Sequence, residues 1–119
     1  MLAMVQLFLR LVAPPGHADE IMQALRTVAR PAQADRGCLW AQLYRADDND
    51  CQISYVEEWA DAAALNRQLG TERFDRLLAV LETAAEPPSF ELRFVNETRG
   101  LDYVAATRLS KTGAPSRTH

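Results

Sequence analysis

The fold is decided by residues 38–59, which read CLWAQLYRADDNDCQISYVEEW. Cys38–Arg45 and Gln52–Trp59 are rich in aromatic and β-branched or other apolar residues, which is typical of strands. Residues 46–50 between them are polar and favour a turn. The stretch therefore predicts an antiparallel hairpin.

The two faces of this hairpin follow from its register. We expect residue 44 to pair with 53 and residue 40 with 57. One face would then hold Trp40, Tyr44, Ile53, Tyr55 and Trp59, and the other Leu39, Ala41, Leu43 and Val56. A slip of one residue would exchange these partners. Both faces are apolar, so each needs something to cover it.

The chain before the hairpin predicts one strand and one helix. Met4–Val12 alternates, with Val5, Leu7, Leu9 and Leu11 on one side. From Ala18 the apolar residues recur with a helical period as far as Ala32. We expect a kink or a restart at Pro31, because proline deep in a helix costs about 3 kcal/mol. The element should end near Gly37.

The chain after the hairpin predicts two helices and a last strand. Asp61 is an N-cap candidate for Ala62–Leu69, which Gly70 should close. Thr71 can cap a second helix, whose stripe includes Phe74 and Leu77. Two prolines at 87–88 stop it, and residues 90–99 alternate again as a strand.

The order β-α-β-β-α-β is that of a ferredoxin-like α+β sandwich. Such a sheet carries its helices on one face, so the second apolar face predicts a homodimer in which two sheets stack. We expect a domain over residues 1–100 and a C-terminal extension over residues 101–119. Residues 101–109 fit either a strand or a helix and should contact the partner subunit, because they are too apolar for a free tail, whereas residues 110–119 are polar and tail-like.

Composition narrows the function classes. A chain of 119 residues suits one domain, and a net charge of −3 argues against a nucleic-acid partner. No run of apolar residues is long enough to span a bilayer, so we expect no membrane contact and a cytoplasmic protein. Cys38 and Cys51 lie at opposite ends of the predicted hairpin and should be unbridged thiols.

Few residues point to chemistry, and each has a structural alternative. No histidine or cysteine pair has metal-ligand spacing, and no glycine-rich loop is present, so neither a metal nor a cofactor is expected. Glu57 is either a solvated strand charge or part of a pocket. Trp59 is either a core anchor or a ring that stacks on a substrate. Tyr44 and Tyr55 either pack the sheet or position a substrate hydroxyl, and a buried Arg10 would need a carboxylate such as Glu57.

The sequence resembles the antibiotic biosynthesis monooxygenase (ABM) family over about residues 4–99. The similarity lies in Gly37-Cys38-Leu39, in Tyr44-Arg45, in the run from Tyr55 to Trp59 before a short helix, and in the spacing to Phe74. The resemblance implies dimers with stacked sheets, the dimeric α/β barrel. It also implies a range of activities, including cofactor-independent oxygenases of polyphenols and quinols, haem-degrading enzymes and proteins without known activity.

Departures from the family pattern narrow this range. Haem-degrading members carry a Trp on the short helix and a His on the next, and ungapped counting from Trp59 places Gln68 and Leu78 there. Leucine cannot ligate iron, so the resemblance implies no haem. Other members place a histidine where this chain has Gln68 or Arg73. Gln6 corresponds to a first-strand Asn of several oxygenases.

Two hypotheses about function follow. The first is a cofactor-independent monooxygenase of a small aromatic or quinol, with Trp59, Gln6, Gln68, Tyr44, Tyr55 and Glu57 as candidate substrate-binding residues and no assigned catalytic residue. The second is a non-catalytic dimeric module that binds a small ligand or only assembles. A cavity lined by Trp59 and Gln68 would favour the enzyme, and a filled core there would favour the module.

Overall fold

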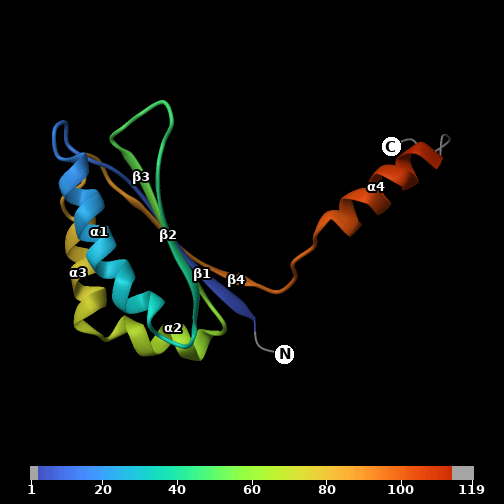
Figure 1. Cartoon of the computed structure of the whole chain (residues 1–119), viewed down its shortest axis with the longest axis horizontal. Helices are drawn as coiled ribbons and strands as arrows, with labels where there is room; N and C mark the ends of the chain where they lie inside the picture. Colours follow the sequence, from blue (N-terminus) through green and yellow to red (C-terminus); the bar gives the residue numbers. More distant parts are fainter. Residues whose placement is uncertain (1–2, 114–119) are drawn as a thin grey trace.

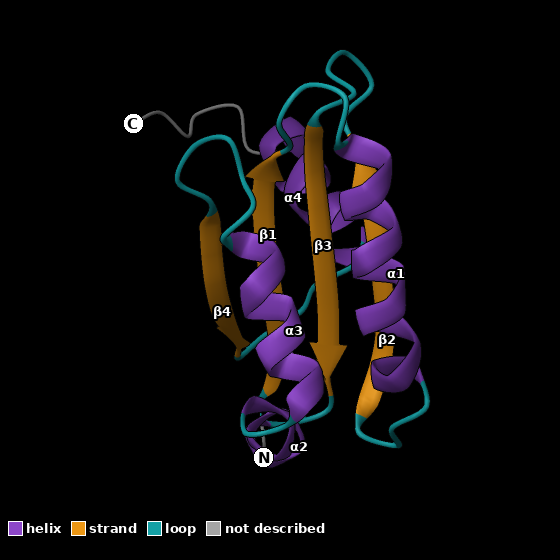
Figure 2. Cartoon of the chain, turned by 90° about the vertical axis from the view of Figure 1, so that its left-hand side faces the viewer, coloured by secondary structure: helices purple, strands orange, loops and turns teal. Residues whose placement is uncertain are grey.

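A computed structural model describes residues 3–113 as one antiparallel sheet with helices on one of its faces (Figures 1 and 2). The strands are β1 (Met4–Val12), β2 (Cys38–Arg45), β3 (Gln52–Trp59) and β4 (Ser89–Val95), in the spatial order β2-β3-β1-β4. The helices are α1 (Ala18–Gln33), α2 (Ala62–Leu69), α3 (Glu72–Leu81) and α4 (Leu101–Gly113). The predicted ferredoxin-like α+β fold is confirmed.

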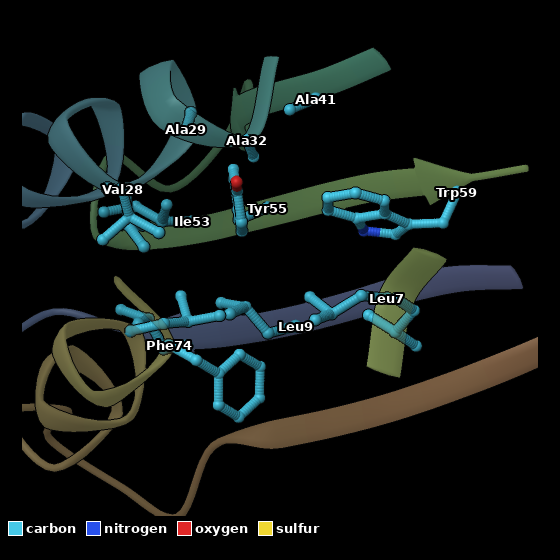
Figure 3. Packing of buried hydrophobic residues seen from close by; sticks show 14 of the residues in the cluster. Leu7, Leu9, Val28, Ala29, Ala32, Ala41, Ile53, Tyr55, Trp59 and Phe74 are labelled. Atoms are coloured by element: carbon cyan, nitrogen blue, oxygen red, sulfur yellow. The ribbon is translucent and has the colours of Figure 1, made fainter. Parts of the chain in front are cut away.

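The core lies between the sheet and helices α1 to α3. β1 pairs with both β3 and β4, and its alternate residues Val5, Leu7, Leu9 and Leu11 are all buried, as the alternation predicts. Figure 3 shows Tyr55 and Trp59 of β3 beside Leu7 and Leu9 of β1. We call the opposite side of the sheet, which no helix covers, the open face.

Helix α1 is continuous through Pro31, so the predicted restart is wrong. Pro31 lies in the last turn, where the missing N–H costs a single backbone hydrogen bond. Ala29 and Ala32 on either side of it are buried against the core, which holds the last turn in place. The helix ends at Gln33, earlier than the predicted end near Gly37.

The hairpin forms as predicted, but most of its register differs by one residue. Cys38 lies opposite Trp59 as expected, whereas Arg45 pairs with Ile53 and Ala41 with Glu57. The cause is a bulge between Cys38 and Trp40, which leaves Leu39 as an extra residue in β2.

The predicted faces are therefore wrong for β2. Ala41 and Leu43 point to the helices, together with Ile53, Tyr55, Glu57 and Trp59. Trp40 and Tyr44 lie on the open face with Val56, and both are exposed.

Both predicted caps are present. The Asp61 side chain accepts a hydrogen bond from the Ala64 N–H at the start of α2, and Thr71 accepts one from the Phe74 N–H at the start of α3. Gly70 follows α2 as predicted, although its φ of −98° lies outside the left-handed region. These caps fix the two helix starts that flank the candidate site.

Residues 101–109, for which the sequence allows either a strand or a helix, form part of helix α4. β4 forms as predicted but ends at Val95, and residues 96–100 lead into α4. Figures 1 and 2 agree that α4 stands clear of the domain, on the opposite side of the sheet from α1 to α3. The end of the predicted polar tail, residues 114–119, lies outside the described residues. No helix within residues 3–113 is long and apolar enough to cross a membrane.

Candidate functional site

A buried carboxylate lies at the centre of the candidate site. Glu57 is 0% exposed and points from β3 toward the helices, between Tyr55 and Trp59 on the same strand face. The indole Nε1–H of Trp59 donates to its Oε1 at 2.9 Å, and the hydroxyl of Tyr55 donates to its Oε2. All three residues face one way because strand side chains alternate with a period of two.

Arg73 of α3 completes the cluster. Its Nη1–H donates to Oε2 of Glu57 at 2.6 Å and its Nη2–H to Oε1 at 3.4 Å. The guanidinium therefore binds both oxygens of the carboxylate. Nη1 also donates to the carbonyl oxygen of Val28 in α1 at 3.3 Å. The Thr71 cap begins α3 just before Arg73 and thereby places it on the buried side, one turn before Leu77. We call Glu57, Tyr55, Trp59 and Arg73 the Glu57 cluster.

Further hydrogen bonds lead outward from the Glu57 cluster. The Nε–H of Arg73 donates to Oε1 of Gln68 at 3.0 Å, and Nε2 of Gln68 donates to Oδ2 of Asp35 at 2.8 Å. The other oxygen of Asp35 accepts from the Gly37 N–H at 2.8 Å. This chain of bonds joins α3, α2 and the loop between α1 and β2, and it ends at side chains that are only half-buried.

Burial and the charge of Glu57 raise the pKa of two side chains, Tyr55 and Cys38. Burial, followed by the charge of Glu57, raises the pKa of the Tyr55 phenol, so this hydroxyl stays protonated and acts as a donor rather than a base. Burial, followed again by Glu57, raises the pKa of the Cys38 thiol to about 11. Neither group is a candidate nucleophile in the neutral range.

The structure brings together four of the six predicted site residues, namely Trp59, Tyr55, Glu57 and Gln68. Gln6 and Tyr44 lie elsewhere. Gln6 is on the open face, where its Nε2 donates to Oε2 of Glu58 at 2.9 Å, and Tyr44 is exposed on that same face.

Arg10, which would need a carboxylate such as Glu57 only if it were buried, is not the partner of Glu57. Arg10 is exposed on the open face, with its guanidinium 5.5 Å from the Phe8 ring centre, and it does not meet Glu57. Arg73 takes that role and was missed as a site residue. Two signals were available: its place in the buried stripe of α3, and its occurrence where other family members have a histidine.

The site is closed in this structure. Trp59 is fully buried, and within the described residues every buried side-chain nitrogen and oxygen has a hydrogen-bond partner. A groove of about 480 Å³ lies between α1 and α3, lined in part by Ile21 and Val80, and a hollow of about 290 Å³ lies beside β2. Neither contacts Trp59 or Gln68. Within residues 3–113, no three histidine, cysteine or acidic side chains gather as a metal site.

Comparisons with known proteins agree with the fold. No curated protein matches the chain in sequence. A crystal structure of PA3566 from Pseudomonas aeruginosa is 27% identical, with a TM-score of 0.67, and the match covers 80% of this chain and 96% of that one. A candidate antibiotic biosynthesis monooxygenase from Caulobacter crescentus CB15 is 26% identical, with a TM-score of 0.70 and coverage of 81% and 92%.

One further structure shares the fold, and a family profile identifies the family. SnoaB of Streptomyces nogalater, described as a cofactor-independent oxygenase, shares the fold at 18% identity, with a TM-score of 0.69 and coverage of 81% and 96%. The family profile described as Antibiotic biosynthesis monooxygenase matches residues 4–80, which is more than half of the sequence. The chain therefore belongs to the antibiotic biosynthesis monooxygenase family.

Proposed function

We propose that this protein is a cofactor-independent monooxygenase of a small electron-rich aromatic compound, such as a phenol or a quinol. One observation carries the proposal: the fully buried Glu57 carboxylate is ringed by donors from Tyr55, Trp59 and Arg73. Stability alone does not require such a cluster, since apolar replacements of buried ion pairs are often at least as stable. Polar groups gathered in the core are typical of reaction sites.

The proposed reaction needs no external reductant. A phenol and O₂ give a quinone and water. One oxygen atom becomes the new carbonyl oxygen, and the other leaves as water with the two hydrogen atoms that the phenol loses. All four electrons come from the aromatic ring. The protein has only to bind the ring, remove the phenolic proton and exclude water.

The Glu57 cluster offers groups for each of these tasks. Glu57 is the proposed base for the phenolic proton, and Arg73 stabilises the phenolate that results. The Trp59 indole provides the face on which an aromatic ring stacks. Gln68 holds Arg73 in place, and its bond to Asp35 has to open for a substrate to enter.

A second candidate function is a non-catalytic module that binds a small ligand or only assembles. The observation that favours it is the closed state of the Glu57 cluster, in which Trp59 is fully buried and all buried polar side-chain atoms of the described residues are paired. In that function the cluster would be a structural ion pair that joins α3 to the sheet.

We also propose that the protein works as a homodimer with stacked sheets. No helix covers the open face, which carries the exposed rings of Trp40 and Tyr44 and the partly buried ring of Phe8. Exposed aromatic rings on an uncovered sheet face are typical of an interface, and the charged side chains of Arg10 and Arg93 lie over Phe8 on the same face.

Incorporation of oxygen from O₂ into a product distinguishes the enzyme from the binding module. The purified protein would be given a panel of phenols, naphthols and hydroquinones under ¹⁸O₂, with the products analysed by mass spectrometry. We expect one labelled atom in each product molecule. Glu57→Gln, which keeps the shape but removes the base, should lose at least about 100-fold in rate. Arg76→Ala, an exposed change on the same helix as Arg73, should keep the full rate.

The opposite outcome is equally specific. In a Trp40→Phe variant, quenching of Trp59 fluorescence by an aromatic ligand that is then recovered unchanged, without oxygen uptake, would contradict the enzyme and support the binding module.

A further inference from the structure

Helix α4 presents apolar side chains without covering any part of its own domain. Leu101 is 83% exposed and Leu109 is 72% exposed, and by helical spacing they form one stripe with Val104 and Ala105. A helix as short as α4 is marginal on its own in water. It therefore needs a surface to pack against.

The same chain has an exposed apolar surface on β4 and α3 against which the apolar stripe of α4 could pack. Phe90, Leu92 and Phe94 point to the helix side of β4, since they pair with the buried residues Leu9, Leu7 and Val5. Figure 2 shows that α1 and α3 lie over the other strands. The Phe90 ring packs edge-on against Phe74 of α3, and Phe90, Leu92 and Phe94 all remain exposed. Leu78 of α3 is exposed one helical turn after Phe74, whose ring contacts Phe90. We call Leu78, Phe90, Leu92 and Phe94 the β4 patch.

A chain does not cover its own β4 patch with its own α4. The patch is on the helix side of the sheet, whereas residues 96–100 carry α4 away on the side of the open face (Figures 1 and 2). The guanidinium of Arg99 lies 4.7 Å from the Tyr103 ring centre and braces the start of the helix in this direction. The helix is thus directed to where a second sheet would stack on the first.

The comparisons indicate that α4 is an addition to the shared fold. The match covers 80% of this chain but 96% of PA3566, and 82% of this chain but all of a Mycobacterium tuberculosis protein. That share of the chain is about what β1 through β4 make up. The shared fold therefore does not account for α4.

We propose that α4 is an exchanged arm that packs on the β4 patch of a second copy of this chain. Because β4 is an edge strand, an arm that passes this edge of the partner sheet arrives directly over the patch. The length of the helix fits that of the strand, since α4 spans about 20 Å and β4 about 24 Å. Two-fold symmetry makes the exchange reciprocal, so both arms and both patches are covered at once.

Disulfide trapping between copies tests the contact. In a background with Cys38→Ser and Cys51→Ser, one copy would carry Val104→Cys and a second copy, with a tag of different mass, Leu92→Cys. We expect a linked heterodimer on mild oxidation. Ser110→Cys, on the opposite side of α4, should link to Leu92→Cys far more slowly. Linkage within one chain carrying both cysteines, or linkage to Trp40→Cys of the open face instead, would overturn the proposal.

A second measurement keeps the two natural cysteines in place. Leu109→Asp puts a charge on the apolar stripe, and Ser110→Asp puts the same charge on the far side of the helix. Sedimentation equilibrium should show at least a tenfold weaker dimer for Leu109→Asp and no change for Ser110→Asp. Because both residues are exposed in the single chain, thermal unfolding of the domain should not distinguish the variants. Equal dimer affinities would overturn the proposal.

Discussion

Nη1 of Arg73 lies 2.6 Å from Oε2 of Glu57, and these two charged side chains are 6% and 0% exposed. The bond ties the first turn of α3 to the central part of the hairpin across the hydrophobic core. Each charge is tolerated there only because the other neutralises it and because further hydrogen bonds satisfy both groups.

Removal of Arg73 should therefore be costly. Arg73→Ala leaves the Glu57 carboxylate buried without a counter-charge, and we expect the free energy of unfolding to fall by about 3–5 kcal/mol. Urea denaturation followed by far-UV circular dichroism measures this change. Arg76→Ala on the same helix removes an exposed ion pair with Glu72 and should stay within about 0.5 kcal/mol of the original protein.

Replacement of both partners should cost less than replacement of Arg73 alone. In Glu57→Gln/Arg73→Met the glutamine still accepts a hydrogen bond from Trp59, and no charge remains unpaired. We expect this double variant to be more stable than Arg73→Ala, which a double-mutant cycle would quantify. A double variant as unstable as Arg73→Ala would mean that the lost packing of the arginine chain, rather than the lost counter-charge, sets the cost.

A close backbone approach at Gly37 provides an independent prediction. A Cβ atom there would lie 2.5 Å from Cβ of Ala64, so α2 would have to shift. We expect Gly37→Ala to lower the free energy of unfolding by about 1–3 kcal/mol, the usual cost of overpacking. Gly70→Ala meets nothing within 4 Å and should be neutral or slightly stabilising. Similar losses at both positions would indicate a backbone effect instead.

The sequence predicts the fold well because the periodicity of the apolar residues is strong. Alternation in β1 and the caps Asp61 and Thr71 are local signals, and each is found in the structure. The hairpin register is not a local property. The bulge at Leu39 shifts all the pairs beyond it by one residue, which moves Trp40 and Tyr44 to the open face.

The candidate site is less predictable from the sequence because it, too, depends on contacts between residues far apart in the chain. Tyr55, Glu57 and Trp59 could be placed on one strand face from their spacing, but the burial of Glu57 depends on Arg73, which is 16 residues away. Charged residues are seldom fully buried, so a strand glutamate is usually predicted to be solvated. Only the packing of α3 over β3 in the folded structure shows that Arg73 and Glu57 meet.

The open face should control dimerisation. Trp40 is exposed in the single chain, so Trp40→Glu should leave the subunit folded but place a charge in the proposed interface. We expect the dissociation constant of the dimer to rise at least tenfold, or about 1.4 kcal/mol. Gln23→Glu adds the same charge to the exposed side of α1 and should leave the constant unchanged. A monomer in both the original and the variant protein would contradict the stacked-sheet dimer.

The reactivity of Cys38 should report the charge on Glu57. Burial, followed by Glu57, raises the pKa of this thiol from 9.0 to about 11, so the folded protein holds less thiolate than the unfolded chain at any pH below 9. Since the thiolate is the reactive form, alkylation of Cys38 by iodoacetamide at pH 8 should be on the order of 100-fold slower in the folded protein.

Alkylation of a Cys51→Ser variant isolates this signal, because Cys38 is then the remaining thiol. The rate should increase steeply as the pH rises from 9 toward 11. Glu57→Gln removes the second-largest cause of the shift, so it should lower the pKa of Cys38 and accelerate alkylation at pH 8. Glu58→Gln removes the adjacent carboxylate, which lies on the open face, and should not change the rate. Equal acceleration by both substitutions would show that a general loss of structure, rather than the charge of Glu57, exposes the thiol.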